Sequence, residues 1–199
     1  MKQLGILISG RGSNFEAIAD KIDAGAIDAG IAVVIANRPE ARGLEIARQR
    51  GLNAVSIPSK GLDREVYDRM LLAELDKYAV DLVCLAGFMR LLSASFIRRF
   101  PHRILNIHPS LLPAFPGLDA QHQALAHGVK ITGCTVHFVD EELDAGPILI
   151  QAAVSVRDDD TVETLSARIL EQEHRIYPEA IRTVLSGNYR VDGRRVILN

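Results

Sequence analysis

The chain has 199 residues, of which 48% are hydrophobic and 24% charged, and its formal net charge is −2. This length suffices for one sizeable α/β domain and is short for two. The charge balance argues against a protein that binds nucleic acid by neutralising phosphates. No apolar run is long enough to cross a bilayer, and the first one is interrupted too early for a secretory signal. We therefore expect a cytoplasmic protein without nucleic-acid or membrane partners.

The two cysteines, Cys84 and Cys134, both lie within apolar runs. This placement predicts buried, reduced thiols rather than a disulfide framework. The spacing of cysteines and histidines matches no metal-binding motif, so we expect no metal.

Short β-rich runs alternate with amphipathic segments through the first half of the chain. In the amphipathic segment at residues 64–78, Val66, Met70, Leu71 and Leu75 recur at helical spacing and predict a core-facing stripe. Such alternation indicates βαβ units, a parallel sheet and right-handed crossovers. We expect strands at 5–9, 31–36, 53–57, 81–86 and 103–107, with helices at 13–24, 41–50, 64–78 and 93–100.

The second half changes pattern. Runs at 133–139 and 148–156 are only a loop apart, so they should pair antiparallel or lie at a sheet edge. A closing helix is expected from a cap at Asp160, with Glu163 three residues on, to about residue 185. A hairpin should follow at 190–198. We therefore predict one α/β domain, residues 1–199: Rossmann-like, with a mostly parallel sheet, helices on both faces and an antiparallel C-terminal edge.

The first βα turn, Ser9-Gly-Arg-Gly-Ser-Asn14, lies where free backbone N–H groups and the helix dipole favour an anion. The structural alternative is a capped helix, because Ser13 and Glu16 fit a capping box. The dinucleotide fingerprint is incomplete, since it needs glycine where the chain has Phe15, and no nucleoside-triphosphate motif is present. A single phosphate group suits the turn better than a dinucleotide.

Asn106 and His108 end an apolar strand. Side chains at i and i+2 leave a strand on the same face, so both polar groups should point to one place. Pro109 and Pro113 then stop the strand and stiffen the loop. Buried polar groups are costly without a use, although two such residues alone could simply satisfy the loop backbone.

A second segment, residues 135–147, favours a functional site over residues that only satisfy the loop backbone. It begins as a strand with Thr135 and His137 on one face and ends in Asp144-Ala-Gly-Pro, a strong turn signal. Glu141 and Glu142 read on their own as a solvated turn. A carboxylate at Asp144 near His108 would favour the imidazolium ion, and with Asn106 this would make an acid catalyst with an oxyanion partner.

These segments, together with residues 63–67, 87–92 and 172–178, closely resemble the phosphoribosylglycinamide formyltransferase family. The resemblance runs from the first strand to about residue 186. The motif Asn106-x-His-Pro-Ser-Leu-Leu-Pro113 belongs to the wider formyltransferase group and implies only the reaction. The turn at Gly12-Ser-Asn14 and the short length imply the substrate.

The resemblance implies transfer of a formyl group from 10-formyltetrahydrofolate, as co-substrate, to the amine of 5-phosphoribosylglycinamide in purine biosynthesis. Asn106, His108 and Asp144 would be catalytic, supported by Thr135 and His137, although Thr135 could equally be a packed core residue. Gly12, Ser13 and Asn14 would bind the substrate phosphate and Glu173 the ribonucleotide; the alternative for Glu173 is an ordinary exposed helix charge. Folate would contact Arg64, Met89, Arg90, Leu91, Leu92, Asn106, Asp140, Glu141, Glu142, Leu143 and Asp144. The phosphate site would occupy the half at about 1–100, and folate binding and catalysis the half at about 101–199.

One position departs from the family: relatives usually carry histidine where this chain has Gln121. Three alternatives stay open. A methionyl-tRNA formyltransferase would need a second, typically basic domain, and a formyltetrahydrofolate hydrolase normally carries an extra N-terminal regulatory domain. A non-catalytic nucleotide-binding module would have no reason to pair Asn106 and His108 with Asp144. We expect a monomer or a homodimer.

Overall fold

The first compact unit, residues 1–106, is built on five parallel strands, the last of which continues to His108, in the computed structural model, which describes all 199 residues. Their order is β3-β2-β1-β4-β5, so the first strand lies in the middle. In a parallel sheet the loops that leave the carboxyl ends of such strands form the usual ligand-binding edge. The strands are β1 (Lys2–Ile8), β2 (Ala29–Ala36), β3 (Ala54–Ser56), β4 (Leu82–Leu85) and β5 (Ile104–His108).

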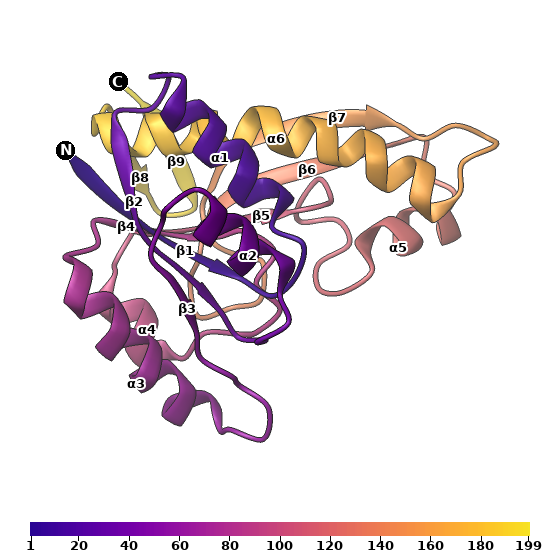
Figure 1. Cartoon of the computed structure of the whole chain (residues 1–199). Coiled ribbons are helices and arrows are strands. Elements are labelled where there is room, and N and C mark those ends of the chain that lie inside the picture. The colour runs from indigo at the N-terminus through magenta and orange to yellow at the C-terminus, as the bar shows by residue number, and fades with distance from the viewer. The chain divides into compact units, whose positions relative to one another are not determined.

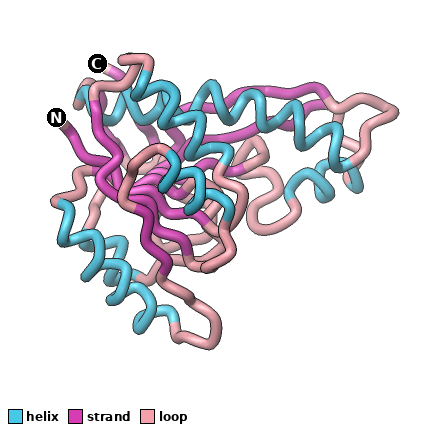
Figure 2. Tube along the Cα trace, viewed as in Figure 1, coloured by secondary structure: helices cyan, strands magenta, loops and turns pink.

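Helices cover both faces of this sheet (Figures 1 and 2). α1 (Ser13–Asp23) and α2 (Arg42–Gln49) contact each other on one face, where α1 buries Phe15 and Ile18. On the other face α3 (Arg64–Leu75), continued by the short 3₁₀ turn η1 (Asp76–Tyr78), contacts α4 (Ala94–Arg99). The expected alternation of strands and helices in this half is confirmed, with ends shifted by at most three residues.

The buried side of α3 differs from the prediction. Val66 and Met70 are 39% and 44% exposed, whereas Tyr67, Leu71 and Leu75 are fully buried. Leu71 and Leu75 are buried as predicted, but the prediction is wrong for Val66 and Met70. The buried face also holds Asp68, a charged residue whose carboxylate accepts a hydrogen bond from the Ser93 backbone N–H. A buried partner for a carboxylate cannot be read from helical periodicity.

Residues 107–199 form the second compact unit. β6 (Ile131–Phe138) pairs antiparallel with β7 (Ile148–Ser155), and β8 (Tyr189–Asp192) with β9 (Arg195–Leu198), in the order β6-β7-β9-β8. The long helix α6 (Val162–Ser186) packs against β6 and β7, and the short α5 (Ala120–Ala126) contacts α6. The predicted fold class, α/β with antiparallel C-terminal strands, is confirmed. None of the helices combines the length and apolar composition that a membrane span needs.

Two predicted helix caps are wrong. α1 is preceded by Gly12 in the left-handed conformation and has no side-chain cap, so the Ser13–Glu16 capping box does not form. α6 is capped by Thr161, whose hydroxyl accepts from the Thr164 N–H, rather than by Asp160. The Asp160 carboxylate instead binds the Arg168 guanidinium and the backbone N–H of residue 157, which removes it from the cap position.

The cap at Thr161 gives a first prediction. Thr161→Ala removes the acceptor of the Thr164 N–H and should lower the free energy of unfolding by about 1 kcal/mol. Thr161→Ser retains the hydroxyl and should stay close to the wild type. Urea unfolding followed by circular dichroism measures both variants, and equal losses in the two would contradict the capping role.

Candidate active site

The turn between β1 and α1 is shaped by close backbone contact. Gly12 has φ 84°, and a Cβ placed on it would lie 2.9 Å from the Cα of Gly43 in α2. The Gly43 N–H donates to the Gly10 carbonyl at 3.1 Å. Helix α2 therefore holds the turn from outside, a role for Gly43 that the sequence interpretation missed because the two glycines lie far apart along the chain.

Gly12, Ser13 and Asn14 lie in this turn and the first turn of α1, as the sequence predicts. Asn14 is buried and Ser13 half-buried. Because no side chain caps the helix, its first N–H groups and the positive end of its dipole face the turn. The arrangement is chemically suited to an anion.

The segment after β4 combines exposed apolar side chains with a firmly anchored backbone. Met89 and Leu91 are 60% and 48% exposed. The Arg90 guanidinium, in contrast, donates to the carbonyls of Ser59 and Leu62 at 3.2 and 3.3 Å and lies 4.7 Å from the Tyr67 ring centroid. The Arg90 side chain therefore anchors the segment, although the resemblance assigns Arg90 to the folate site. Of two other folate residues expected in this unit, Leu92 is buried, whereas Arg64 is exposed at the start of α3.

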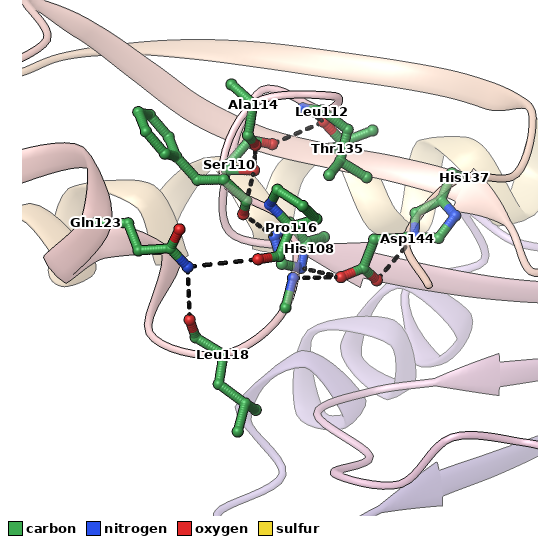
Figure 3. A network of polar contacts seen from close by, with 12 residues as sticks. His108, Ser110, Leu112, Ala114, Pro116, Leu118, Gln123, Thr135, His137 and Asp144 are labelled. Atoms are coloured by element: carbon green, nitrogen blue, oxygen red, sulfur yellow. Dashed lines mark hydrogen bonds and ion pairs between the residues drawn. The ribbon is translucent and has the colours of Figure 1, made fainter. Parts of the chain in front are cut away.

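In the second unit one carboxylate faces two histidines (Figure 3). Asp144 Oδ2 lies 3.4 Å from His108 Nδ1, and Oδ1 lies 3.8 Å from His137 Nε2. Oδ2 also accepts the Gly117 N–H at 2.8 Å. All three side chains are nine-tenths buried or more, so water screens their interactions weakly. The predicted meeting of His108 and Asp144 is present in the fold.

The backbone fixes the position of Asp144. Its φ of 49° lies in the left-handed region, which is uncommon for a residue with a side chain. Two residues later Gly146 packs on β6: a Cβ there would lie 1.9 Å from the Phe138 carbonyl oxygen. The Phe138 N–H also donates to the Pro147 carbonyl at 2.9 Å. The Gly-Pro turn thus returns the chain onto β6 and leaves the carboxylate little freedom.

The second nitrogen of His108 faces the loop that follows β5. Nε2 lies 2.8 Å from the Phe115 carbonyl oxygen, which can only accept, so Nε2 carries the hydrogen. Ser110, fully buried, donates its hydroxyl to the Ala114 carbonyl at 2.5 Å and contacts the same Phe115 oxygen at 3.3 Å. Both nitrogens of His108 therefore face acceptors, and a doubly protonated ring satisfies both contacts.

His137 is held as a neutral ring. Burial lowers its pKa, and the charge of His108 acts in the same direction, against the opposing effects of the Phe138 carbonyl and Asp144. Nδ1 lies 2.9 Å from the Phe138 carbonyl and must donate to it. The lone pair of the neutral ring is then on Nε2, toward Asp144.

Thr135, predicted as a supporting residue, anchors the loop after His108. Its hydroxyl donates to the Ser110 carbonyl at 2.7 Å and accepts the Leu112 N–H at 3.1 Å. Gln151 on β7 adds hydrogen bonds from Nε2 to Thr135 Oγ1 and to the Leu112 carbonyl. Gln151 was missed, since its only signal is an amide inside an otherwise apolar strand.

Glu173 is only 7% exposed on α6, so the interpretation as an ordinary exposed helix charge is wrong. Burial is the main cause that raises the pKa of the Cys134 thiol to about 12, and the charge of Glu173 is the second. Cys134 and Cys84 are both buried and unbridged, as predicted. Gln121 lies half-buried in α5, and the neighbouring His122 is exposed.

The remaining predicted residues are distributed between the two units. Asn106 lies two residues before His108 on β5, at the end of the first unit. In the acidic loop of the second unit, Asp140 accepts the Glu142 N–H at 3.1 Å, while Glu141, Glu142 and Leu143 are exposed. No group of three or more histidine, cysteine or acidic side chains is arranged to hold a metal ion.

Comparisons with known proteins show which family this chain belongs to. The model of the formyl transferase family matches residues 2–181. The chain is 44% identical to the phosphoribosylglycinamide formyltransferase of Escherichia coli (strain K12), covering 96% of this chain and 94% of that protein. It is 48% identical to the trifunctional purine biosynthetic protein adenosine-3 of Drosophila melanogaster, of which it spans only 14%. The crystal structure of glycinamide ribonucleotide transformylase 1 from Symbiobacterium toebii superposes with a TM-score of 0.97 at 54% identity, covering 100% of this chain and 94% of that one.

The chain belongs to the formyl transferase family. Within that family, the resemblance to phosphoribosylglycinamide formyltransferases that the motifs indicate is confirmed, as is the prediction of a transferase.

The lowered pKa of His137 gives a prediction about stability. As the pH falls below about 6.5, the ordinary pKa of histidine, His137 binds a proton in the unfolded chain but stays neutral in the folded protein. The free energy of unfolding therefore falls as the pH falls. His137→Gln should reduce the loss of unfolding free energy between about pH 7.5 and pH 5.5. His122→Gln, at an exposed histidine, should leave that loss unchanged. Chemical denaturation at both pH values decides, and identical pH dependence in wild type and His137→Gln would refute the assignment.

Proposed function

We propose that this protein transfers the formyl group of 10-formyltetrahydrofolate to the amine of 5-phosphoribosylglycinamide, giving formylglycinamide ribonucleotide and tetrahydrofolate in purine biosynthesis. The observation that carries the proposal is the buried contact between His108 and Asp144 at the end of β5. A module that only binds nucleotides has no need to bury a carboxylate against an imidazole, because the pair is costly to desolvate.

The reaction exchanges one C–N bond for another. The substrate amine attacks the formyl carbon, and negative charge develops on the formyl oxygen of a tetrahedral intermediate. The bond from carbon to the folate nitrogen then breaks, the folate nitrogen gains a proton and the amine loses one. The chain must therefore stabilise an oxyanion and supply a proton to the leaving nitrogen.

Asn106 and His108 have the chemistry for both tasks. They lie two residues apart on β5, where strand geometry directs alternate side chains to one face. The Asn106 amide and the Nδ1–H of a charged His108, which Asp144 holds only loosely at 3.4 Å, would donate to the oxyanion, and the same N–H would protonate the leaving nitrogen. Asp144 would hold the charge and the orientation of the His108 ring, a role supported by its 3.4 Å contact and fixed backbone.

The two binding segments of the first unit suit the two substrates. The uncapped turn at Gly12, Ser13 and Asn14 would bind the phosphate of the ribonucleotide. The exposed side chains of Met89 and Leu91 would lie against the pterin, as would Leu143 in the second unit. Glu173 would bind the ribonucleotide, Thr135 and His137 would support the catalytic residues, and Arg64 with Asp140, Glu141 and Glu142 would complete the folate site.

Formyl transfer to three acceptors tests the proposal and its phosphate site together. Glycinamide ribonucleotide should be formylated rapidly, whereas the riboside without the 5-phosphate should be a far poorer acceptor. Water alone should give little tetrahydrofolate. Absorbance of the folate product measures all three rates. Release of tetrahydrofolate without an amine would identify a hydrolase instead, and equal rates for nucleotide and riboside would contradict the phosphate assignment.

Asp144→Asn tests the catalytic pair. The amide oxygen can still accept the Gly117 N–H, so the fold and substrate binding should survive while turnover falls about 100-fold or more. Single-turnover rates provide the measurement. The control is Asp158→Asn, because the exposed carboxylate of Asp158 pairs only with Lys130. Normal turnover of Asp144→Asn would show that Asp144 has no part in the mechanism.

A cytoplasmic location and a monomeric or dimeric state stay predictions from the sequence. Small-molecule substrates agree with the relatives named above.

A further inference from the structure

Ser9 lies between the two binding segments of the first unit. It directly follows β1 and directly precedes the turn at residues 10–14, and its side chain is almost fully buried. Its backbone N–H donates to the Gly87 carbonyl at 3.0 Å. Its hydroxyl oxygen accepts the Met89 N–H at 2.7 Å. One residue therefore joins the start of the phosphate turn to residues 87 and 89, just before and at the start of the segment at 89–92, by one hydrogen bond each.

Each of the two segments is also anchored on its other side. The phosphate turn rests on α2, through the Gly43 N–H and the contact between Gly12 and Gly43. The segment at 89–92 is held by Arg90, through the carbonyls of Ser59 and Leu62. Because these anchors are separate, displacement of one segment would reach the other mainly through Ser9.

We propose that the Ser9 hydroxyl is a positioning group that couples the two substrate sites, so that binding of the ribonucleotide strengthens binding of the folate. The inference rests on the proposed function, because it takes the turn as the phosphate site and the segment at 89–92 as the folate site. A phosphate that draws the turn into one conformation also fixes the Ser9 Oγ atom, and with it the backbone of Met89. Coupling between ligands is reciprocal, so folate strengthens ribonucleotide binding by the same factor.

The expected size follows from the hydrogen bond. Ser9→Ala leaves the partly buried Met89 N–H without its acceptor, and such losses typically weaken the affected state by up to about tenfold. The lost hydrogen bond should weaken folate binding. It should above all reduce the factor by which the ribonucleotide strengthens folate binding, because each segment keeps its own anchor. Couplings of this kind usually amount to about 5-fold to 150-fold.

The chain contains a matched control. The hydroxyl of Ser56 on β3 is buried in the same unit and makes no hydrogen bond. Ser56→Ala therefore removes the same atom without breaking a link. Ser9→Cys supplies a second test variant, because its sulfur is a weaker acceptor at the same position. Thermal unfolding of all three variants shows whether each is folded before binding is compared.

The experiment is calorimetric titration of tetrahydrofolate, with and without saturating glycinamide ribonucleotide. This pair cannot react, so catalysis does not enter. In the wild type and in Ser56→Ala the ribonucleotide should tighten tetrahydrofolate binding at least about fivefold. In Ser9→Ala that factor should fall close to one, with ribonucleotide binding alone nearly unchanged, and Ser9→Cys should be intermediate.

The outcomes separate the two proposals. A wild type that binds neither ligand would overturn the proposed function, and this inference with it. A wild type that binds both ligands without coupling would overturn the inference alone. So would a folded Ser9→Ala that keeps the wild-type factor, or a Ser56→Ala that loses it.

Discussion

The buried carboxylate of Asp144 joins three parts of the second unit, because it accepts the Gly117 N–H and faces both His108 and His137. A charge buried to this degree is stable only where donors or cations surround it. The Gly117 N–H and His108 can act in this way, whereas the lone pair of His137 cannot. The chain turns tightly at Gly146, and the backbone of Asp144 is strained. Both features fix the position of the carboxylate at a cost in local conformational energy.

In the first unit, residues outside the loops at the strand ends hold those loops in place. The segments proposed to bind substrates leave the carboxyl ends of parallel strands, where the backbone has no ladder partner and can face a ligand. Gly43 packs behind the turn at residues 10–14, and Tyr67 lies beneath Arg90.

Much of this arrangement follows from the sequence, and the failures have physical causes. The alternation of strands and helices and the meeting of His108 with Asp144 could be predicted, since periodicity, turn residues and a motif signal them. The exposed sides of Val66 and Met70, the cap at Thr161 and the burial of Glu173 could not. The first depends on a tertiary partner, Ser93 for Asp68, and the second on Arg168, which lies beyond the first two turns of α6 and binds Asp160. The burial of Glu173 depends on how α6 packs on the sheet, which its local pattern does not show.

The two cysteines give the protein one internal reporter in each unit. Cys84 lies on β4 in the first unit and Cys134 on β6 in the second, and neither thiol is exposed. Because the thiolate is the reactive form, a buried thiol reacts with an alkylating reagent only when its strand opens. Alkylation rates at the two sites therefore measure the opening of each half separately, without any engineered label, and distinguish local from global unfolding.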